Sequence, residues 1–101
     1  MAYMFYSADA FNQDISSWDV SAVSSMSEMF FYAVAFNQNI SSWNVSAVTS
    51  MDYMFYNADA FNHDITGWNL KQGVSANFMF QSADAWNSAY RLIVEGNSPG
   101  D

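Results

Sequence analysis

Hydrophobic residues recur along this chain at intervals of about three positions. Around Val48, Met51 and Met54 this spacing places the apolar side chains on one face of a helix, and Asp52 suits its first turn. The stretch at 64–68 is instead rich in aromatic and β-branched side chains, which predicts a short strand. The predicted helical segments are 25–33, 50–58 and 75–83.

The same pattern returns every 25 residues, so the chain consists of internal repeats. A Met-Phe pair begins at positions 4, 29, 54 and 79, and a Phe-Asn or Trp-Asn pair begins at positions 11, 36, 61 and 86. Because one unit has nothing of its own to bury its apolar stripe against, we expect a single domain over residues 1–101. The units are 1–25, 26–50, 51–75 and 76–100.

Stacking of equivalent units would bury the apolar stripe and align the same side chains from unit to unit. The sequence therefore predicts an α/β repeat fold, a short solenoid of four 25-residue coils that each contain a short strand and helical turns. We expect an invariant asparagine column to form an internal ladder that pairs with loop backbone groups; a row of amides that contacts carbohydrate is the alternative. The aromatic ladders are Phe11, Phe36, Phe61 with Trp86, and Trp18, Trp43 with Trp68; the asparagine ladder is Asn12, Asn37, Asn62 and Asn87.

The spacing MF-x-x-A-x-x-FN-x-x-I-x-x-W-x-V-x-x-V-x-x-M resembles the BspA-like surface-protein repeats of the leucine-rich-repeat clan, which include 25-residue repeats of mycoplasma lipoproteins. The resemblance covers residues 1 to about 87. It implies a leucine-rich-repeat-like coil and a location outside the cell or on its surface. It implies no activity, because the molecular function of these repeats is unknown.

The repeat pattern, and with it the apolar stripe, differs between the two ends of the chain. From about Ala89 the repeat pattern lapses, and the run 90–96 alternates like an edge strand that carries Arg91 and Glu95. We interpret the last unit as a divergent C-terminal cap. The first unit begins in register with the interior units, which predicts an open apolar end and end-to-end association through the first coil as a two-fold homodimer.

Composition and charge limit the classes of partner. Ten acidic residues against Lys71 and Arg91 give a net charge of −8, which argues against nucleic-acid binding. No apolar run is long enough to insert into a membrane, and no basic stretch followed by an apolar one marks a signal peptide in this chain. Without cysteine there is no disulfide, thiolate metal site or redox motif, and we expect no cofactor.

No arrangement of residues points to catalysis. His63 is the only histidine. Ser41 or Thr66 could be paired with His63 as a nucleophile and its base, but serine is so abundant in this chain that such a pairing is uninformative. The aspartates occupy polar, turn-like contexts and lack the apolar pocket that raises the pKa of a general acid. We therefore expect no enzymatic activity and no catalytic residues.

Carboxylates recur in three columns of the repeat. Stacked carboxylates could chelate calcium, but a neutral asparagine separates the aspartates of one column, and no known calcium-binding motif is present. Solvated turn residues are the simpler interpretation, and a calcium-dependent module is the alternative. The columns are Asp14, Asn39 and Asp64; Asp9, Val34, Asp59 and Asp84; and Asp19, Asn44 and Asn69.

Two further columns mix aromatic residues with Glu28 or Gln81, so we expect them to be partly exposed. Exposed tyrosines are large, rigid and amphipathic, and they suit protein or glycan contacts; the alternative is that they only cover the gap between coils. The chain is thus predicted to be a binding or adhesion module, with a structural spacer or a piece of a longer array as the alternative. The candidate binding residues are Tyr3, Tyr6, Phe31, Tyr32, Tyr53 and Tyr56.

Overall fold

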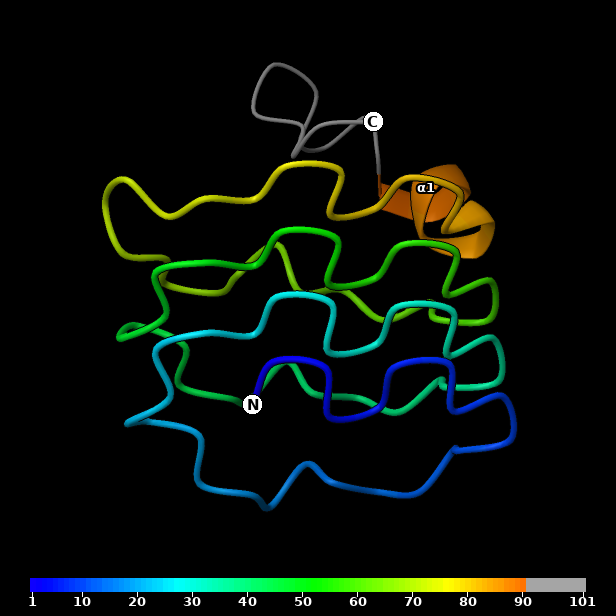
Figure 1. The fold of residues 1–101 in the computed structure, drawn as a ribbon, viewed down its shortest axis with the longest axis horizontal. Helices are drawn as coiled ribbons and strands as arrows, with labels where there is room; N and C mark the ends of the chain where they lie inside the picture. Colours follow the sequence, from blue (N-terminus) through cyan, green and yellow to red (C-terminus); the bar gives the residue numbers. More distant parts are fainter. Residues whose placement is uncertain (91–101) are drawn as a thin grey trace.

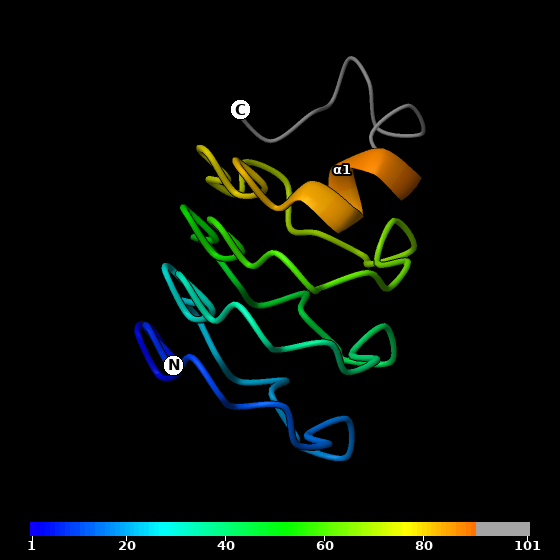
Figure 2. The same cartoon turned by 90° about the vertical axis from the view of Figure 1, so that its right-hand side faces the viewer.

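The backbone winds so that segments 25 residues apart lie one above another, as a computed structural model that describes residues 1–90 shows (Figure 1). We call residues 1–25, 26–50 and 51–75 the first, second and third layers; residues 76–90 continue the stack. Figure 2 shows the stacking from the side, with the tight turns that open each layer along one face. Backbone hydrogen bonds join adjacent layers; the N–H of Phe30, for example, donates to the carbonyl of Met54 over 2.9 Å.

The start of each layer is built from consecutive turns. In the second layer, the turns 26–29 and 30–33 are each closed by a hydrogen bond from the N–H of the last residue to the carbonyl of the first. Their third residues, Glu28 and Tyr32, have φ of 56° and 58°, as type II turns require. The N–H groups of residues 28, 30 and 32 donate to the third layer instead. Backbone N–H groups thus donate alternately to a carbonyl of the same layer and to a carbonyl of the adjacent layer.

The predicted α/β solenoid is therefore wrong. Within residues 1–90 the structure has one helix, α1 (Asp84–Tyr90), and no strand or sheet. Parallel pairing in this range is limited to isolated bridges that join Ser25, Ser50 and Ser75. The apolar spacing is misleading because a series of turns closed between residues i and i+3, like a helix, brings every third or fourth side chain to the same side.

The second half of each layer is also made of turns. The strand expected at 64–68 is absent: the N–H of Trp68 donates to the carbonyl of Ile65, and the N–H of Thr66 donates to Asp64 Oδ1. A short polar side chain that bonds to the backbone two residues on competes with β pairing for the same groups. The helices expected at 25–33, 50–58 and 75–83 are replaced by the turns described above.

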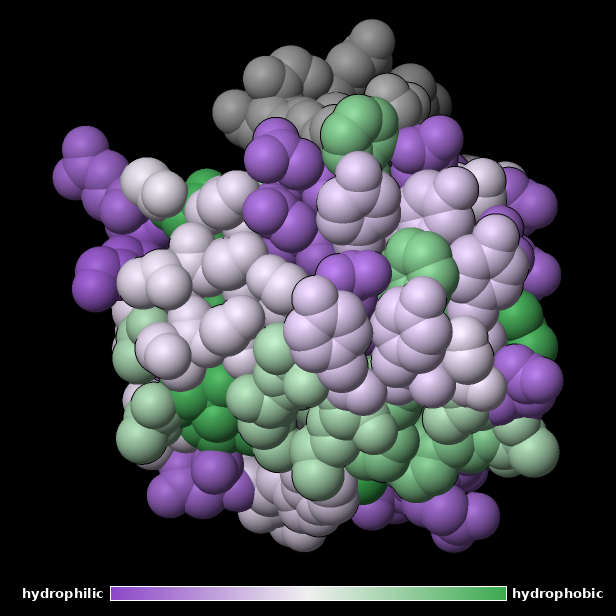
Figure 3. All heavy atoms as spheres, in the orientation of Figure 1, coloured by the Kyte–Doolittle hydropathy of each residue, from purple (hydrophilic) through white to green (hydrophobic). Residues whose placement is uncertain are grey.

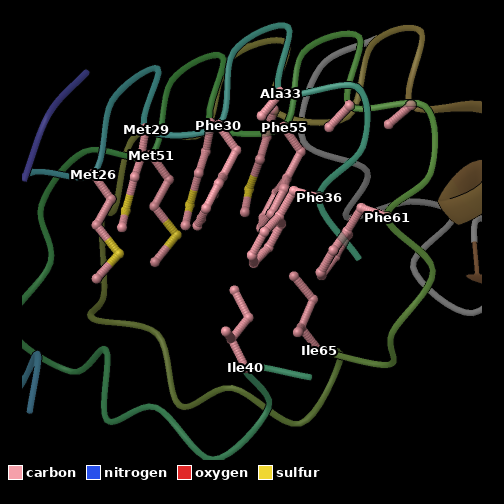
Figure 4. Close-up of a cluster of buried hydrophobic side chains, with 14 of the residues drawn as sticks. Met26, Met29, Phe30, Ala33, Phe36, Ile40, Met51, Phe55, Phe61 and Ile65 are labelled. Carbon is pink, nitrogen blue, oxygen red and sulfur yellow. The ribbon is translucent and has the colours of Figure 1, made fainter. Parts of the chain in front are cut away.

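The core is a stack of aromatic rings, with methionine side chains beside the rings and isoleucines facing them (Figure 4). The Phe30 ring stacks on Phe36 in its own layer, with the centroids 4.2 Å apart, and on Phe55 in the next layer at 5.4 Å. Phe36 in turn stacks on Phe61 at 5.9 Å. All four side chains are fully buried. Two columns of the repeat supply these rings, of which the sequence analysis recognised only the second: Phe5, Phe30, Phe55 and Phe80, and Phe11, Phe36, Phe61 and Trp86.

The tryptophan column joins the layers through its indole N–H groups. Trp43 Nε1 donates to the carbonyl of Ile15 over 3.1 Å, and Trp68 Nε1 donates to the carbonyl of Ile40 over 3.2 Å. Trp43 is only 4% exposed, whereas Trp18 in the first layer is 37% exposed. Each of these carbonyls also accepts the N–H that closes its own turn, so the indole is a second donor that holds adjacent layers in register.

Helix α1 is the element that the repeat pattern does not predict. It begins at Asp84, whose carboxylate suits the first turn of a helix. Inside it, the Trp86 ring stacks on Phe80 with the centroids 3.6 Å apart. No helix within residues 1–90 has the length and apolar character needed to cross a bilayer. The cap expected over 90–96 lies, apart from its first residue, outside the described residues.

The first layer has an open edge. Met4 is 50% exposed, whereas its equivalent Met29 is fully buried. In the second layer, a row of three carbonyls accepts N–H groups from the first layer. The equivalent carbonyls of Ala2, Met4 and Tyr6 receive no donor from residues 1–90. The edge therefore presents hydrogen-bond acceptors together with apolar surface.

Candidate functional site

Seven aromatic side chains form one continuous surface over the turns that open each layer, and we call this surface the aromatic face. Tyr3 is its most exposed member at 57%, and Tyr32 and Phe78 are each 40% exposed. Figure 3 views this side of the molecule: residues of intermediate or high hydropathy cover most of its middle, and strongly hydrophilic residues gather toward its margins. The aromatic face consists of Tyr3, Tyr6, Phe31, Tyr32, Tyr53, Tyr56 and Phe78.

Rings at the same repeat position stack across layers, because hydrogen-bonded backbones lie about 4.8 Å apart. Phe31 lies between Tyr6 and Tyr56, with centroid distances of 4.8 Å to each and interplanar angles of 4° and 9°. Tyr53 stacks on Phe78 at 5.3 Å. Both faces of the Phe31 ring are therefore covered, and the ring edges and tyrosine hydroxyls are left for contact with a partner.

Two rings of the aromatic face are tilted against the stack. The Tyr32 ring makes angles of 59° with Phe31 and 53° with Tyr56. The Tyr3 ring makes an angle of 52° with Tyr6. Within residues 1–90, neither Tyr3 nor Tyr32 stacks in parallel on another ring, which accounts for their high exposure.

Glu28 places a carboxylate among these rings. It occupies the repeat position of Tyr3, Tyr53 and Phe78, and its side chain is half-buried. A hydrogen bond with Glu28, together with the negative charge of its carboxylate, raises the pKa of the Tyr3 hydroxyl. Sequence reasoning treated Glu28 and Phe78 only as signs that the column is exposed, and it did not name either as a binding residue. Their shared repeat position with Tyr3 and Tyr53 was the signal that could have identified them.

The asparagine column forms the predicted ladder of bonds to backbone groups, but its first three members lie on the surface, so the expected internal placement is wrong. Asn12, Asn37 and Asn62 are exposed, yet their side chains bond between layers. Asn12 Oδ1 accepts the N–H of Asn37 over 2.8 Å, and Asn37 Oδ1 accepts the N–H of Asn62 over 3.0 Å. In the last unit, Asn87 Nδ2 donates to the carbonyl of Phe80. The column thus contributes to the fold from outside the core.

We expect Asn37→Leu to lower the free energy of unfolding by about 0.5–1.5 kcal/mol. The variant removes the acceptor of the Asn62 N–H, but water can replace it because the site is exposed. Urea denaturation would measure the change, with Asn69→Leu as the control, since Asn69 is exposed and makes no side-chain hydrogen bond within residues 1–90. Equal losses in the two variants would contradict a role for the column in stability.

Two of the three acidic columns stabilise turns of their own layer. Asp14 Oδ1 accepts the N–H of Ser16 over 2.9 Å, and Asp19 Oδ1 accepts both the N–H and the hydroxyl of Ser21. Hydrogen bonds from the hydroxyl and the N–H of the residue two positions on lower the pKa of Asp14, Asp19 and Asp64. Within residues 1–90, no three His, Asp or Glu side chains are grouped so that they could hold a metal ion.

Stability is expected to decline in acid. The folded-state pKa of Asp14, Asp19 and Asp64 lies below the ordinary value of 3.8, so their contribution is complete above that value and is lost as the pH falls through the lower, folded-state pKa. Thermal unfolding followed by circular dichroism between about pH 7 and about pH 2.5 would measure the decline. A triple Asp→Asn variant should decline less steeply, because Asn39 and Asn44 already make the same turn bonds. An unchanged pH profile in that variant would contradict the assignment.

His63 also takes part in contacts between layers. Its Nε2 lies 3.2 Å from the carbonyl oxygen of Asn37, and its ring centroid lies 5.9 Å from that of Phe61. Thr66, which the sequence allowed as a nucleophile, directs its hydroxyl to Asp64 Oδ1. That the chain is not an enzyme stays a prediction.

Comparison with known proteins identifies the family of the chain. The sequence model of the family described as "Mycoplasma protein of unknown function, DUF285" matches residues 1–92. Because this match covers most of the chain, the chain belongs to that family. Neither the curated proteins nor the solved structures provide a match.

Proposed function

We propose that this member of the DUF285 family is a non-enzymatic binding module that contacts a protein or glycan partner through its aromatic face. One observation carries the proposal: seven rings from successive layers form a single surface, in which four rings are exposed and three are half-buried. Aromatic side chains bury a large contact area with little loss of side-chain entropy, so they contribute much of the affinity of recognition surfaces. The stacked backbone holds these rings in place before a partner arrives.

The proposal includes adhesion at a cell surface. The Met-Phe and Phe-Asn pairs of each unit resemble those of BspA-like surface-protein repeats, and this resemblance supports a location outside the cell or on its surface. A surface-displayed module would present the aromatic face to partners in its surroundings.

The test uses the labelled chain on a glycan array and on an array of purified proteins. The variant is Tyr6→Gln with Tyr56→Gln, since the chain already carries glutamine at the equivalent position 81. We expect at least one class of probe to bind the parent chain and to bind the variant about ten-fold more weakly or worse, because a central aromatic contact contributes about 2 kcal/mol or more.

Leu70→Gln is the matched control. Leu70 is also a large exposed apolar residue, but it lies outside the aromatic face, and its replacement should leave array binding unchanged. If no signal on either array depends on the two tyrosines, the proposal fails and the chain acts as a structural spacer. A strict requirement for calcium in the binding buffer would instead favour the calcium-dependent module.

A two-fold homodimer through the first layer also stays a prediction. Such a contact would bury the exposed side chains of Met4 and Trp18. Two-fold symmetry would, however, bring two rows of carbonyl acceptors together, so the contact would be apolar and its carbonyls would bond to water. Static light scattering is expected to show about twice the 11.4 kDa mass of the chain. A monomer at high concentration would contradict the dimer.

A further inference from the structure

We propose that the partner of the aromatic face is a protein segment that carries basic side chains beside apolar or aromatic ones. The inference rests on the proposed function and specifies the chemistry of the partner. Three features of the aromatic face support it: the covered ring faces, the carboxylate among the rings, and the acidic residues that flank them.

At the stacked rings the geometry favours a protein over a glycan, whereas no parallel ring within residues 1–90 covers the faces of the tilted Tyr3 and Tyr32 rings. A sugar that binds by stacking needs an open, flat ring face. Tyr6 and Tyr56 cover both faces of Phe31, and Phe78 covers one face of Tyr53. The ring edges and tyrosine hydroxyls that stay open are suited to apolar side chains and to backbone carbonyls.

Glu28 gives the aromatic face a negative charge within an apolar surface. Its side chain is half-buried, and its carboxylate acts on the Tyr3 hydroxyl through a hydrogen bond and its charge. When a partner covers the face and excludes water, the interaction of this carboxylate with a lysine or arginine of the partner becomes stronger. Lys71 is the one Lys or Arg within residues 1–90, and it takes no part in the ring contacts of the aromatic face.

Further carboxylates lie close to the aromatic face. Asp9 and Asp59 are exposed and follow Tyr6 and Tyr56, respectively, by three residues. Three residues span at most about 11 Å, which is comparable to the screening length of about 8 Å at physiological ionic strength. Together with the net charge of −8, these carboxylates attract a basic segment and repel an acidic one.

The test uses three defined probes in a fluorescence anisotropy titration of the full chain. The first is a fluorescein-labelled hexapeptide of alternating arginine and tryptophan, the second has glutamate in place of arginine, and the third is a labelled N-acetylglucosamine trisaccharide. We expect the arginine peptide to bind, and the glutamate peptide and the trisaccharide to bind at least about ten-fold more weakly.

Two variants, each of which removes one negative charge, distinguish a specific contact from non-specific electrostatic attraction. Glu28→Gln should weaken binding of the arginine peptide about five-fold or more, because the Glu28 carboxylate lies within the proposed contact. Asp14→Asn should change the affinity by less than about two-fold, because Asp14 lies outside the aromatic face and Asn39 shows that the amide keeps the turn. Circular dichroism melts of both variants would check that each is folded.

The possible outcomes separate a failure of the inferred partner chemistry from a failure of the proposed binding function. Equal losses of affinity for the arginine peptide in Glu28→Gln and Asp14→Asn would mean that the peptide is attracted non-specifically to an acidic protein. This result would overturn the inference. Tyrosine-dependent binding of the trisaccharide without binding of the arginine peptide would also overturn it, but would leave the proposed function in place. The absence of any tyrosine-dependent signal on the arrays would overturn both.

Discussion

Replacing Phe55 with alanine is expected to lower the free energy of unfolding by about 3–5 kcal/mol. The Phe55 side chain is fully buried and stacks on Phe61 at 4.4 Å and on Phe30 and Phe80 at 5.4 Å. The resulting cavity cannot close easily, because backbone hydrogen bonds such as that from the Phe55 N–H to the carbonyl of Met79 set the spacing of the layers. A domain of this size is stabilised by only about 5–15 kcal/mol in total, so the variant would be close to unfolding.

Urea denaturation followed by tryptophan fluorescence would measure this loss. Phe78→Ala is the control, because Phe78 is exposed and its one ring partner within residues 1–90 is Tyr53. Its loss should be about 1 kcal/mol or less. Losses of similar size in the two variants would contradict the assignment of the ring stack as the core.

The second large effect is expected at Ser7, where two substitutions should act in opposite directions. Ser7 has φ of 55°, a conformation that costs a residue with a Cβ about 1–2 kcal/mol and costs glycine little. Ser7→Gly should therefore stabilise the chain by about 0.5–1 kcal/mol, after the greater freedom of glycine in the unfolded state is subtracted. Ser7→Val should destabilise it by about 1–3 kcal/mol, because a branched Cβ fits this conformation poorly.

Ser17→Val is the matched control for these two variants. Ser17 is also an exposed serine in a turn, but its φ is not positive. Its replacement should change the free energy of unfolding by no more than about 0.5 kcal/mol in the same urea titration. If Ser7→Val had an equally small effect, the backbone conformation at Ser7 would not be strained.

The local conformation was the part of the fold that sequence reasoning could not derive. Residues 50–58 carry apolar side chains at helical spacing and no glycine, so a helix was the natural expectation. The structure instead places Tyr53 and Asn57 at φ of 58° and 59°. Residues with a Cβ rarely adopt this conformation; asparagine is enriched in it, but tyrosine at position 53 gives no such signal. The bonds between layers, which the sequence does not display, compensate for its cost.

The candidate site was partly visible in advance. Comparison of the four units separated columns that keep one residue type from columns that accept Glu28 or Gln81, and the second kind supplies the aromatic face. The same comparison did not reveal the exposure of Asn37 and Asn62, because an invariant polar column is expected whether its hydrogen bonds lie inside the core or on its surface.

Three features could be read from the amino-acid sequence alone: the 25-residue period, the sets of side chains that share a repeat position, and membership of a mycoplasma repeat family. These features were readable because residues separated by one period occupy equivalent places in stacked units, so Phe36 was expected to meet Phe61, as it does. The choice between helices and consecutive turns, in contrast, was visible only in the folded chain. A spacing of three residues fits both conformations, and the choice depends on hydrogen bonds to residues about 25 positions away rather than to neighbours in the chain.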